Sequence, residues 1–203
     1  MPFTAPKRID FGAVIRRKAA DTVPAPILTR AERCRVAQIR EAAAVLGLLP
    51  RPGQTLHALL VARFDLVDLI DVLLSKLGPA RIAAATLSFN RRSCRVILGW
   101  LDAQRVTALS LLSSSFHKDH NPQLFAEFKA ELKKRNARLA ADRVHAKVVA
   151  LHFAGGERLA LETSANLRCN GNIEQMALTS DAELCRWHTD WIEARITAHE
   201  GDG

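Results

Sequence analysis

Closely spaced cysteines, long apolar runs and a serine-hydrolase signature are all missing from this chain of 203 residues. Its four cysteines, Cys34, Cys94, Cys169 and Cys185, lie far apart and form no CxxC pair, so a zinc knuckle is not expected. The sequence has no run of about 18 apolar residues, which argues against a membrane-spanning helix. Ser113–Ser115 lacks the G-x-S-x-G elbow of a serine nucleophile, so no such nucleophile is predicted.

The first residues also lack the pattern of a secretory signal. They are basic, but they contain no continuous apolar core and no small-residue cleavage site. Without such a signal, reduced thiols and a cytoplasmic location are the expectation.

Positive charge exceeds negative charge, with 29 Lys and Arg residues against 21 Asp and Glu residues. The resulting net charge of +8 favours polyanionic partners, nucleic acid above all. The alternative is that the excess charge serves only solubility. The basic residues gather near residues 7–18, 91–95 and 133–135.

Residues 1–53 are predicted to form a basic arm followed by a helix, ahead of one globular domain over residues 54–203. Prolines and clustered positive charge mark the arm. The helix is predicted to begin at Thr29, where a weak capping box occurs, and to run through Ala-rich sequence to Leu46. Phosphate binding, partner binding and simple mobility are all open roles for the arm.

Strand patterns and helix patterns alternate along the rest of the chain. Strands are predicted over residues 56–61, 81–89, 106–114, 144–153 and 158–163. Helices are predicted over residues 65–77 and 90–104, and from residues 121 and 181 onward. Such alternation predicts an α/β fold, a sandwich with a central mixed β-sheet flanked by helices.

His145 and Lys147 are the most informative pair in the sequence. Residues two apart in a strand point to the same face, so the imidazole and the ammonium are expected side by side. An imidazole can attack a phosphate, and an ammonium offsets the phosphate charge. Ser164, Asn166 and Glu174 follow downstream. The pair alone is a weak signal, and an ordinary strand with a solvated histidine is the alternative.

Together these residues resemble the phospholipase D superfamily. Its motif is His-x-Lys, four residues, Asp, and then a small-residue turn that ends in Ser-x-Asn. His145, Lys147, Ser164 and Asn166 stand at matching positions, and Glu174 matches the acid of single-motif, nuclease-like members. The resemblance implies a phospholipase D-like sandwich, in agreement with the alternating elements.

Two positions depart from that motif. His152 stands where the motif has Asp, and Thr163 stands where a Gly usually precedes the Ser. Strand parity predicts that His152 points to the face opposite to His145. This departure lowers the expectation of catalysis more than the expectation of the fold.

The resemblance also implies a mechanism that needs no metal and no cofactor. Two histidines face each other across one phosphate, and one copy of the motif therefore implies a homodimer. One His145 forms a phosphohistidine and the other protonates the leaving oxygen. Lys147 and Asn166 hold the nonbridging oxygens, Ser164 adds a hydrogen bond, and Glu174 orients the imidazole.

Four further residues are predicted to contact phosphate or nucleic acid. Arg91 and Arg92 lie at a strand-to-helix junction, where backbone N–H groups can also receive a phosphate. His117 and Lys118 belong to residues 116–120, which are predicted to be a polar loop at a strand end. Solvated arginines are the alternative for the first pair, and a metal site built from the His and Asp side chains is an alternative for the loop.

The leading interpretation is a metal-independent phosphodiesterase, a nuclease that acts on DNA or RNA. One alternative is a noncatalytic nucleic-acid-binding module that keeps the phosphate pocket, and His152 favours it. Another is a phospholipid-acting enzyme of the same superfamily. The basic charge argues against a membrane partner, as does the lack of an amphipathic helix suited to a membrane surface.

Overall fold

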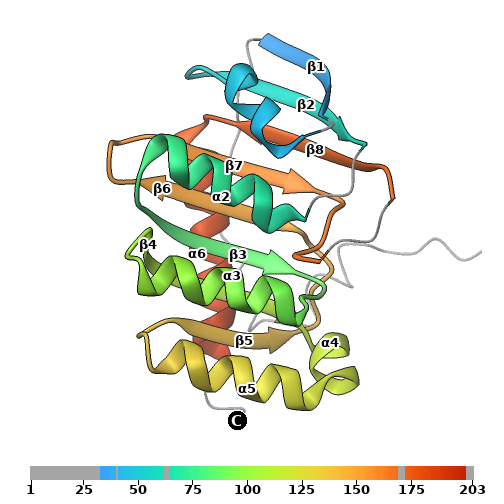
Figure 1. The fold of residues 1–203 in the computed structure, drawn as a ribbon, viewed down its shortest axis with the longest axis vertical. Coiled ribbons are helices and arrows are strands. Elements are labelled where there is room, and N and C mark those ends of the chain that lie inside the picture. The colour runs from blue at the N-terminus through green and yellow to red at the C-terminus, as the bar shows by residue number, and fades with distance from the viewer. Residues whose placement is uncertain (1–32, 40, 62–64, 169–171, 200–203) are drawn as a thin grey trace, which may run out of the picture.

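Figure 1 shows the computed structural model of the chain, which describes residues 33–39, 41–61, 65–168 and 172–199. Its strands are β1 (Arg33–Ile39), β2 (Gln54–Leu60), β3 (Ala80–Thr86), β4 (Val106–Ser114), β5 (Arg138–Asp142), β6 (Val148–Phe153), β7 (Arg158–Thr163) and β8 (Glu174–Thr179). Its helices are the 3₁₀ helix η1 (Ala42–Leu48) and the α-helices α2 (Leu66–Leu77), α3 (Arg91–Asp102), α4 (Ser115–His120), α5 (Pro122–Lys133) and α6 (Ala182–Ala198).

The described strands form an 8-stranded sheet in the order β1-β2-β8-β7-β6-β3-β4-β5. Pairing is parallel at β1–β2, β3–β4 and β4–β5. It is antiparallel from β2 through β8, β7 and β6 to β3. Helices cover both faces of this sheet, so the predicted α/β sandwich with a central mixed sheet is confirmed.

The two faces of the sheet are packed differently. Helices α2, α3 and α5 lie on one face, and α6 runs across the other (Figure 1). Under α6 the strands present small buried side chains, Ala83, Ala85, Ala150 and Ala160. Small side chains allow a helix to approach the sheet closely, so α6 packs against five neighbouring strands. The larger aliphatic and aromatic side chains fill the core on the opposite face.

Several helix starts follow directly from the sequence. The side chain of Asn90 accepts a hydrogen bond from the backbone N–H of Ser93 at 2.9 Å, as an N-cap residue does. Asp181 caps α6 by accepting from the backbone N–H groups of Glu183 and Leu184. Pro122 stands in the first turn of α5, where its missing N–H costs nothing. None of the described helices is long and apolar enough to cross a membrane.

The helix predicted from Thr29 to Leu46 is wrong over residues 33–39. Residues 33–39 form β1, which pairs in parallel with β2, and only residues 42–48 are helical, as the 3₁₀ helix η1. Pairing with the neighbouring strand supplies backbone hydrogen bonds that outweigh a modest helix propensity. Residues 1–32, including the predicted arm, lie outside the described residues. The division at residue 53 stays a prediction.

Two further local predictions are corrected. Residues 116–120 lie in helix α4, because the Ser114 hydroxyl accepts from the backbone N–H of His117 at 3.0 Å and starts a helical turn. The strand predicted from residue 144 begins only at Val148. His145 and Lys147 therefore stand in irregular backbone just before β6. Strands β5 and β8 complete the sheet beyond the predicted set.

Candidate active site

The predicted catalytic residues gather at one end of the sheet. Val148, at the start of β6, pairs with Ala85 near the end of β3 and with Glu162 near the end of β7. Thr163, at the end of β7, pairs with Met176 near the start of β8. The chain segments that leave these strands therefore meet at the carboxyl end of the parallel strands, where α/β folds place their ligands.

His145 and Lys147 lie in contact at this end. The Lys147 ammonium donates to the backbone carbonyl of His145 at 2.9 Å and lies 3.1 Å from Nδ1 of its ring. The predicted adjacency of the two side chains is thus found, although irregular backbone and not a strand produces it. The backbone carbonyl of Lys147 accepts from the N–H of Thr163 at 3.0 Å, which ties the pair to β7. His145 is exposed among the described residues.

The Lys147 ammonium is subject to two opposing influences. Partial burial lowers its pKa below the ordinary lysine value, and the negative charge of Glu174 acts to raise it. Glu174 begins β8, two strands away from β6 in the sheet. The acid predicted from the sequence is therefore within electrostatic range of the predicted lysine.

Ser164 and Glu174 are joined directly. The Ser164 hydroxyl donates to the Glu174 carboxylate and accepts from the backbone N–H of Gln175 at 3.0 Å. The neighbouring Thr163 hydroxyl donates to the carbonyl of Gln175 at 2.6 Å and accepts from the N–H of Ala165 at 3.0 Å. These bonds fasten the turn after β7 to the start of β8. Thr163 stands where the resembled motif has Gly, and its hydroxyl helps to hold this turn in place.

Buried polar atoms without partners collect at the same end of the sheet. Among the described residues they are Ser88 Oγ, Ser113 Oγ, His117 Nε2 and Asn166 Oδ1. Ser88 follows β3, Ser113 stands near the end of β4, and His117 lies in the helix after β4. Asn166 lies in the turn after β7, and its neighbour Leu167 bridges to Phe89. An unpaired buried polar atom costs free energy, and such atoms are typical of functional sites.

His152 lies away from this constellation. Its Nε2 atom is 2.7 Å from the Thr189 hydroxyl of α6, and burial lowers the pKa of its imidazole. The side chain therefore faces α6. That this face is opposite to the one of His145 stays a prediction, because His145 lies in irregular backbone before β6. His152 lies five positions beyond Lys147 along extended chain, a distance of roughly 16 Å. The departure from the resembled motif therefore falls outside the candidate site.

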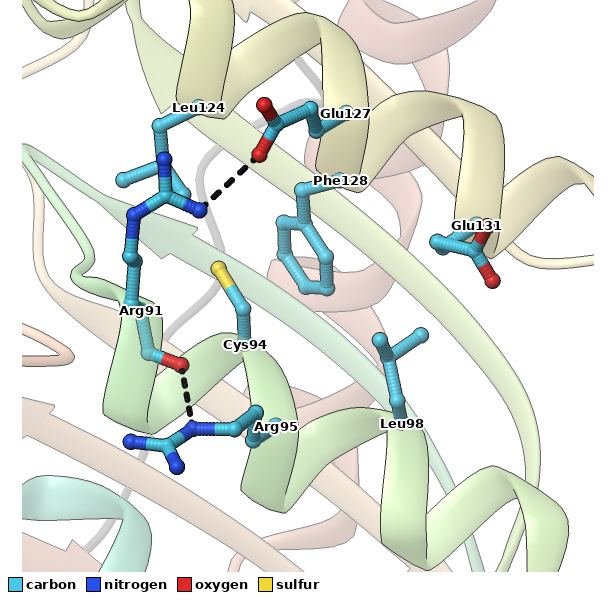
Figure 2. Close-up of a pocket in the computed structure, with 8 residues that line it drawn as sticks. All are labelled: Arg91, Cys94, Arg95, Leu98, Leu124, Glu127, Phe128 and Glu131. Carbon is cyan, nitrogen blue, oxygen red and sulfur yellow. Dashed lines mark hydrogen bonds and ion pairs between the residues drawn. The ribbon is translucent and has the colours of Figure 1, made fainter.

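The predicted phosphate-contacting arginines both have acidic partners. Arg92 donates to Asp65 at 2.5 Å and to Asp68 at 2.6 Å, and these hydrogen bonds, that to Asp68 above all, raise its pKa. Figure 2 shows Arg91 beside Glu127 of α5, 2.9 Å away. Contact of Arg91 and Arg92 with nucleic acid stays a prediction, but the charge of Arg92 is already matched by two carboxylates.

Replacing Arg92 by Ala should therefore act on stability. Only 5% of the Asp65 side chain is exposed, so its carboxylate loses its partner inside the protein. The expected loss is about 2 kcal/mol in the free energy of unfolding, measured by urea denaturation. Arg91→Ala is the matched control, since it breaks an exposed ion pair and should cost a small fraction of that. Equal losses from the two variants would contradict this assignment.

The pocket in Figure 2 lies between α3 and α5 and has an apolar floor. Cys94 stands in it, and burial raises the pKa of its thiol to about 12. The group therefore stays protonated near neutral pH, which makes it a poor nucleophile. Cys94 is buried and packs as a small hydrophobic residue.

His117 and Lys118 lie in α4 but line different cavities. His117 lines a cavity with Arg168, at the same end of the sheet as His145. Lys118 lines a neighbouring cavity with Lys129 and Lys133. Among the described residues, no group of three or more His, Cys, Asp and Glu side chains is arranged to hold a metal ion.

Arg168 was not predicted from the sequence to be a phosphate-contacting residue. It follows Asn166 by two positions, and its charge lowers the pKa of His117 in addition to the larger effect of burial. Its place two positions after the Ser-x-Asn turn could have indicated a contact with phosphate. The exposed ring of Phe116, which lies against His120, was missed as well.

Comparisons with known proteins identify no relative by sequence. No protein-family model matches the chain. No curated protein matches it either.

Solved structures with a similar arrangement were found at low identity. NucT from Helicobacter pylori matches 72% of this chain and 98% of its own, with 16% identity and a TM-score of 0.48. Nuc from Salmonella typhimurium, a phospholipase D family member, matches 70% of this chain and 96% of its own, with 11% identity and a TM-score of 0.45. TrmBL2, an archaeal chromatin protein with a novel mode of DNA binding, matches 70% of this chain with 14% identity and a TM-score of 0.45. This chain spans about half of that protein, 53% of its length.

Proposed function

We propose that this chain is a metal-independent phosphodiesterase of the phospholipase D type, a nuclease that cleaves DNA or RNA through a phosphohistidine. Two identical subunits share the proposed site. The observation that carries the proposal is the contact of His145 with Lys147 at the exposed end of the sheet, beside the fixed Ser164–Glu174 pair. These are the residues that the motif resemblance implies, and the fold brings four of them together from segments up to 29 residues apart along the chain (145 to 174).

In the first step, a ring nitrogen of one His145 attacks the phosphorus atom. A P–N bond forms as the P–O bond to the leaving strand breaks. The leaving oxygen takes a proton from His145 of the partner subunit, which acts as general acid. In the second step, water attacks the phosphohistidine and the P–N bond breaks. His145 of the partner subunit accepts the proton of that water, and the electron pair of the P–N bond returns to nitrogen.

The neighbouring side chains stabilise the charge that builds on phosphorus. Lys147, already placed against the His145 ring, holds a nonbridging oxygen. Asn166 is proposed to hold another through its amide. Glu174 holds Ser164 and acts on the charge of Lys147. Its contact with the imidazole, which the resemblance implies, stays a prediction.

Cleavage in EDTA tests this function. Purified protein should nick plasmid DNA or cut a labelled RNA with EDTA present, because the proposed nucleophile and acid are both side chains. Reactions with ³²P-labelled substrate, stopped with denaturant at alkaline pH where the P–N bond survives, should yield a phosphorylated histidine at position 145. Loss of cleavage in EDTA, with recovery on adding a divalent cation, would contradict the proposal. Binding without nicking would favour the noncatalytic module, and release of headgroup from phosphatidylcholine vesicles would favour the lipid-acting enzyme.

A further inference from the structure

A second cavity lies beside the candidate active site and offers donors to an anion. It has a volume of about 580 Å³ and lies between the start of α3, helix α4 and Arg168. Among the described side chains that line it there is no carboxylate, while Asn90, Arg91, Asn121 and Arg168 all line it. Arg168 is exposed and has no ion pair among the described residues.

His117 supplies the cavity with a buried polar atom that has no partner. Its side chain lines the cavity, yet the residue is 4% exposed. Asn121 Nδ2 lies 3.3 Å from His117 Nδ1, and an amide nitrogen only donates, so Nδ1 is the acceptor. Burial first, and Arg168 second, lower the pKa of His117, which keeps the ring neutral near neutral pH. The ring proton therefore sits on Nε2, an N–H donor that finds no acceptor among the described residues.

The start of α3 adds a favourable field. Asn90 is the N-cap of this helix of 12 residues, and the first N–H groups of a helix attract negative charge. The Arg91 side chain reaches the rim of the cavity, although Glu127 offsets part of its charge. Two cations, a helix start and a buried N–H donor thus converge on one space, and a phosphate suits all of them.

An exposed aromatic ring stands next to this cavity. Phe116 is 60% exposed, and its ring lies 3.9 Å from that of His120, between ring centroids, with an interplanar angle of 32°. His120 itself lines the cavity. Any of the nucleic-acid bases can stack on an exposed aromatic ring. A lipid headgroup or a free phosphate has no base, so the exposed ring of Phe116 favours a nucleotide as the ligand.

The cavity is close to the proposed catalytic residues. Asn166 and Arg168 are two residues apart, so their Cα atoms lie within about 7 Å. Leu167, between them, bridges to Phe89, which packs edge-on against His117 at 4.4 Å between ring centroids. The turn after β7 thus carries Asn166, which the proposed mechanism uses, and Arg168, which lines the cavity.

We propose that the cavity and Phe116 form a nucleotide subsite of the proposed phosphodiesterase. A phosphate next to the scissile one binds between His117, Arg168 and the start of α3, and its base stacks on Phe116. This inference rests on the proposed function, since the subsite serves to hold the strand on which His145 acts. The ligand class is therefore a nucleic-acid strand with at least one unstacked base.

The test compares two substrates, one long enough to occupy both sites and one that occupies only the catalytic site. A fluorescein-labelled single-stranded oligonucleotide fills both sites, whereas bis(4-nitrophenyl) phosphate fills only the site at His145. The measured quantity is the ratio of kcat/KM for the oligonucleotide to kcat/KM for the small diester. Arg168→Ala should lower this ratio roughly tenfold by removing a charged contact, and Phe116→Ala should lower it to a similar extent. His117→Phe keeps the ring against Phe89 and removes the N–H donor, and it should also lower the ratio.

Arg95→Ala is the matched control, because Arg95 is a basic residue of α3 that lines the other pocket. At constant ionic strength it should leave the ratio unchanged. Equal effects of Arg168→Ala and Arg95→Ala overturn the subsite, and an unchanged ratio in Phe116→Ala overturns the base contact. If wild-type protein cleaves neither substrate, the proposed catalysis fails. Fluorescence anisotropy of the oligonucleotide with the same variants then still decides the subsite, since weaker binding in Arg168→Ala than in Arg95→Ala supports it and equal binding overturns it.

Discussion

Replacing His145 by Ala should lower phosphodiester turnover by roughly 10⁴-fold or more and leave the fold intact. The loss is large because the variant removes both the proposed nucleophile and, in the partner subunit, the proposed general acid. The fold should be unaffected because His145 is exposed and its ring contacts Lys147, only two positions away in the chain. Single-turnover cleavage gives the first quantity, and thermal unfolding followed by circular dichroism gives the second.

His152→Ala is the control for the same residue type. His152 lies under α6 and bonds to Thr189, so its removal should cost about 1 kcal/mol of unfolding free energy and spare turnover. An equal loss of turnover in the two variants, with both proteins folded, would show that the roles are misassigned.

Mixing His145→Ala protein with wild-type protein tests the shared site. After subunit exchange at equal amounts, about one quarter of the dimers contain two wild-type subunits. If each reaction needs two imidazoles from a two-fold dimer, activity should fall to about one quarter of that of wild-type protein at the same total concentration. Independent subunits would keep about one half. The measurement also decides whether one copy of the motif per chain is enough for catalysis.

The parts of the fold that the sequence predicts are those set by neighbouring residues. Asn90 and Asp181 are N-caps that accept from N–H groups within the next three residues, so their helices are visible in the sequence. The prediction for residues 33–39 is wrong because the partner of β1, strand β2, begins some 20 residues later, and this pairing overrides the local helix pattern. Propensity cannot report a hydrogen-bonding partner that lies elsewhere in the chain.

The candidate site divides in the same way. The His145–Lys147 contact is local, and the motif spacing predicts it even though the backbone there is irregular. The pairing of Arg92 with Asp65 spans 27 residues, so the sequence around Arg92 does not reveal it. The position of Arg168 depends on the bridge between Phe89 and Leu167, which joins distant segments. The charge of a residue is known from the sequence. The partner that neutralises this charge, or the contact that directs it into a cavity, is seen only in the folded chain.

Replacing Lys147 by Met should lower turnover roughly 10²- to 10³-fold, the usual cost of removing a group that stabilises transition-state charge. The wild-type rate should also fall as pH rises, because Lys147 must be protonated to hold a nonbridging oxygen. Burial lowers the Lys147 pKa, so this alkaline decline should begin below the pH expected for an ordinary lysine. Lys147→Arg should remove the part of the decline that is due to Lys147, since a guanidinium stays charged throughout the accessible pH range. The part due to loss of the proton from the general acid, His145 of the partner subunit, should remain.

Glu174→Gln should shift that pH profile in a direction set by the charge of Glu174. The charge of Glu174 raises the Lys147 pKa, so its removal lets the pKa fall further and the alkaline decline should move to lower pH. Glu162→Gln is the matched control, because this carboxylate on β7 bonds to His188 of α6 and should leave the decline in place. A shift to higher pH in Glu174→Gln, or no shift at all, would mean that Glu174 does not act on the ammonium during the reaction. The acid would then be confined to holding Ser164 and the turn that carries Asn166.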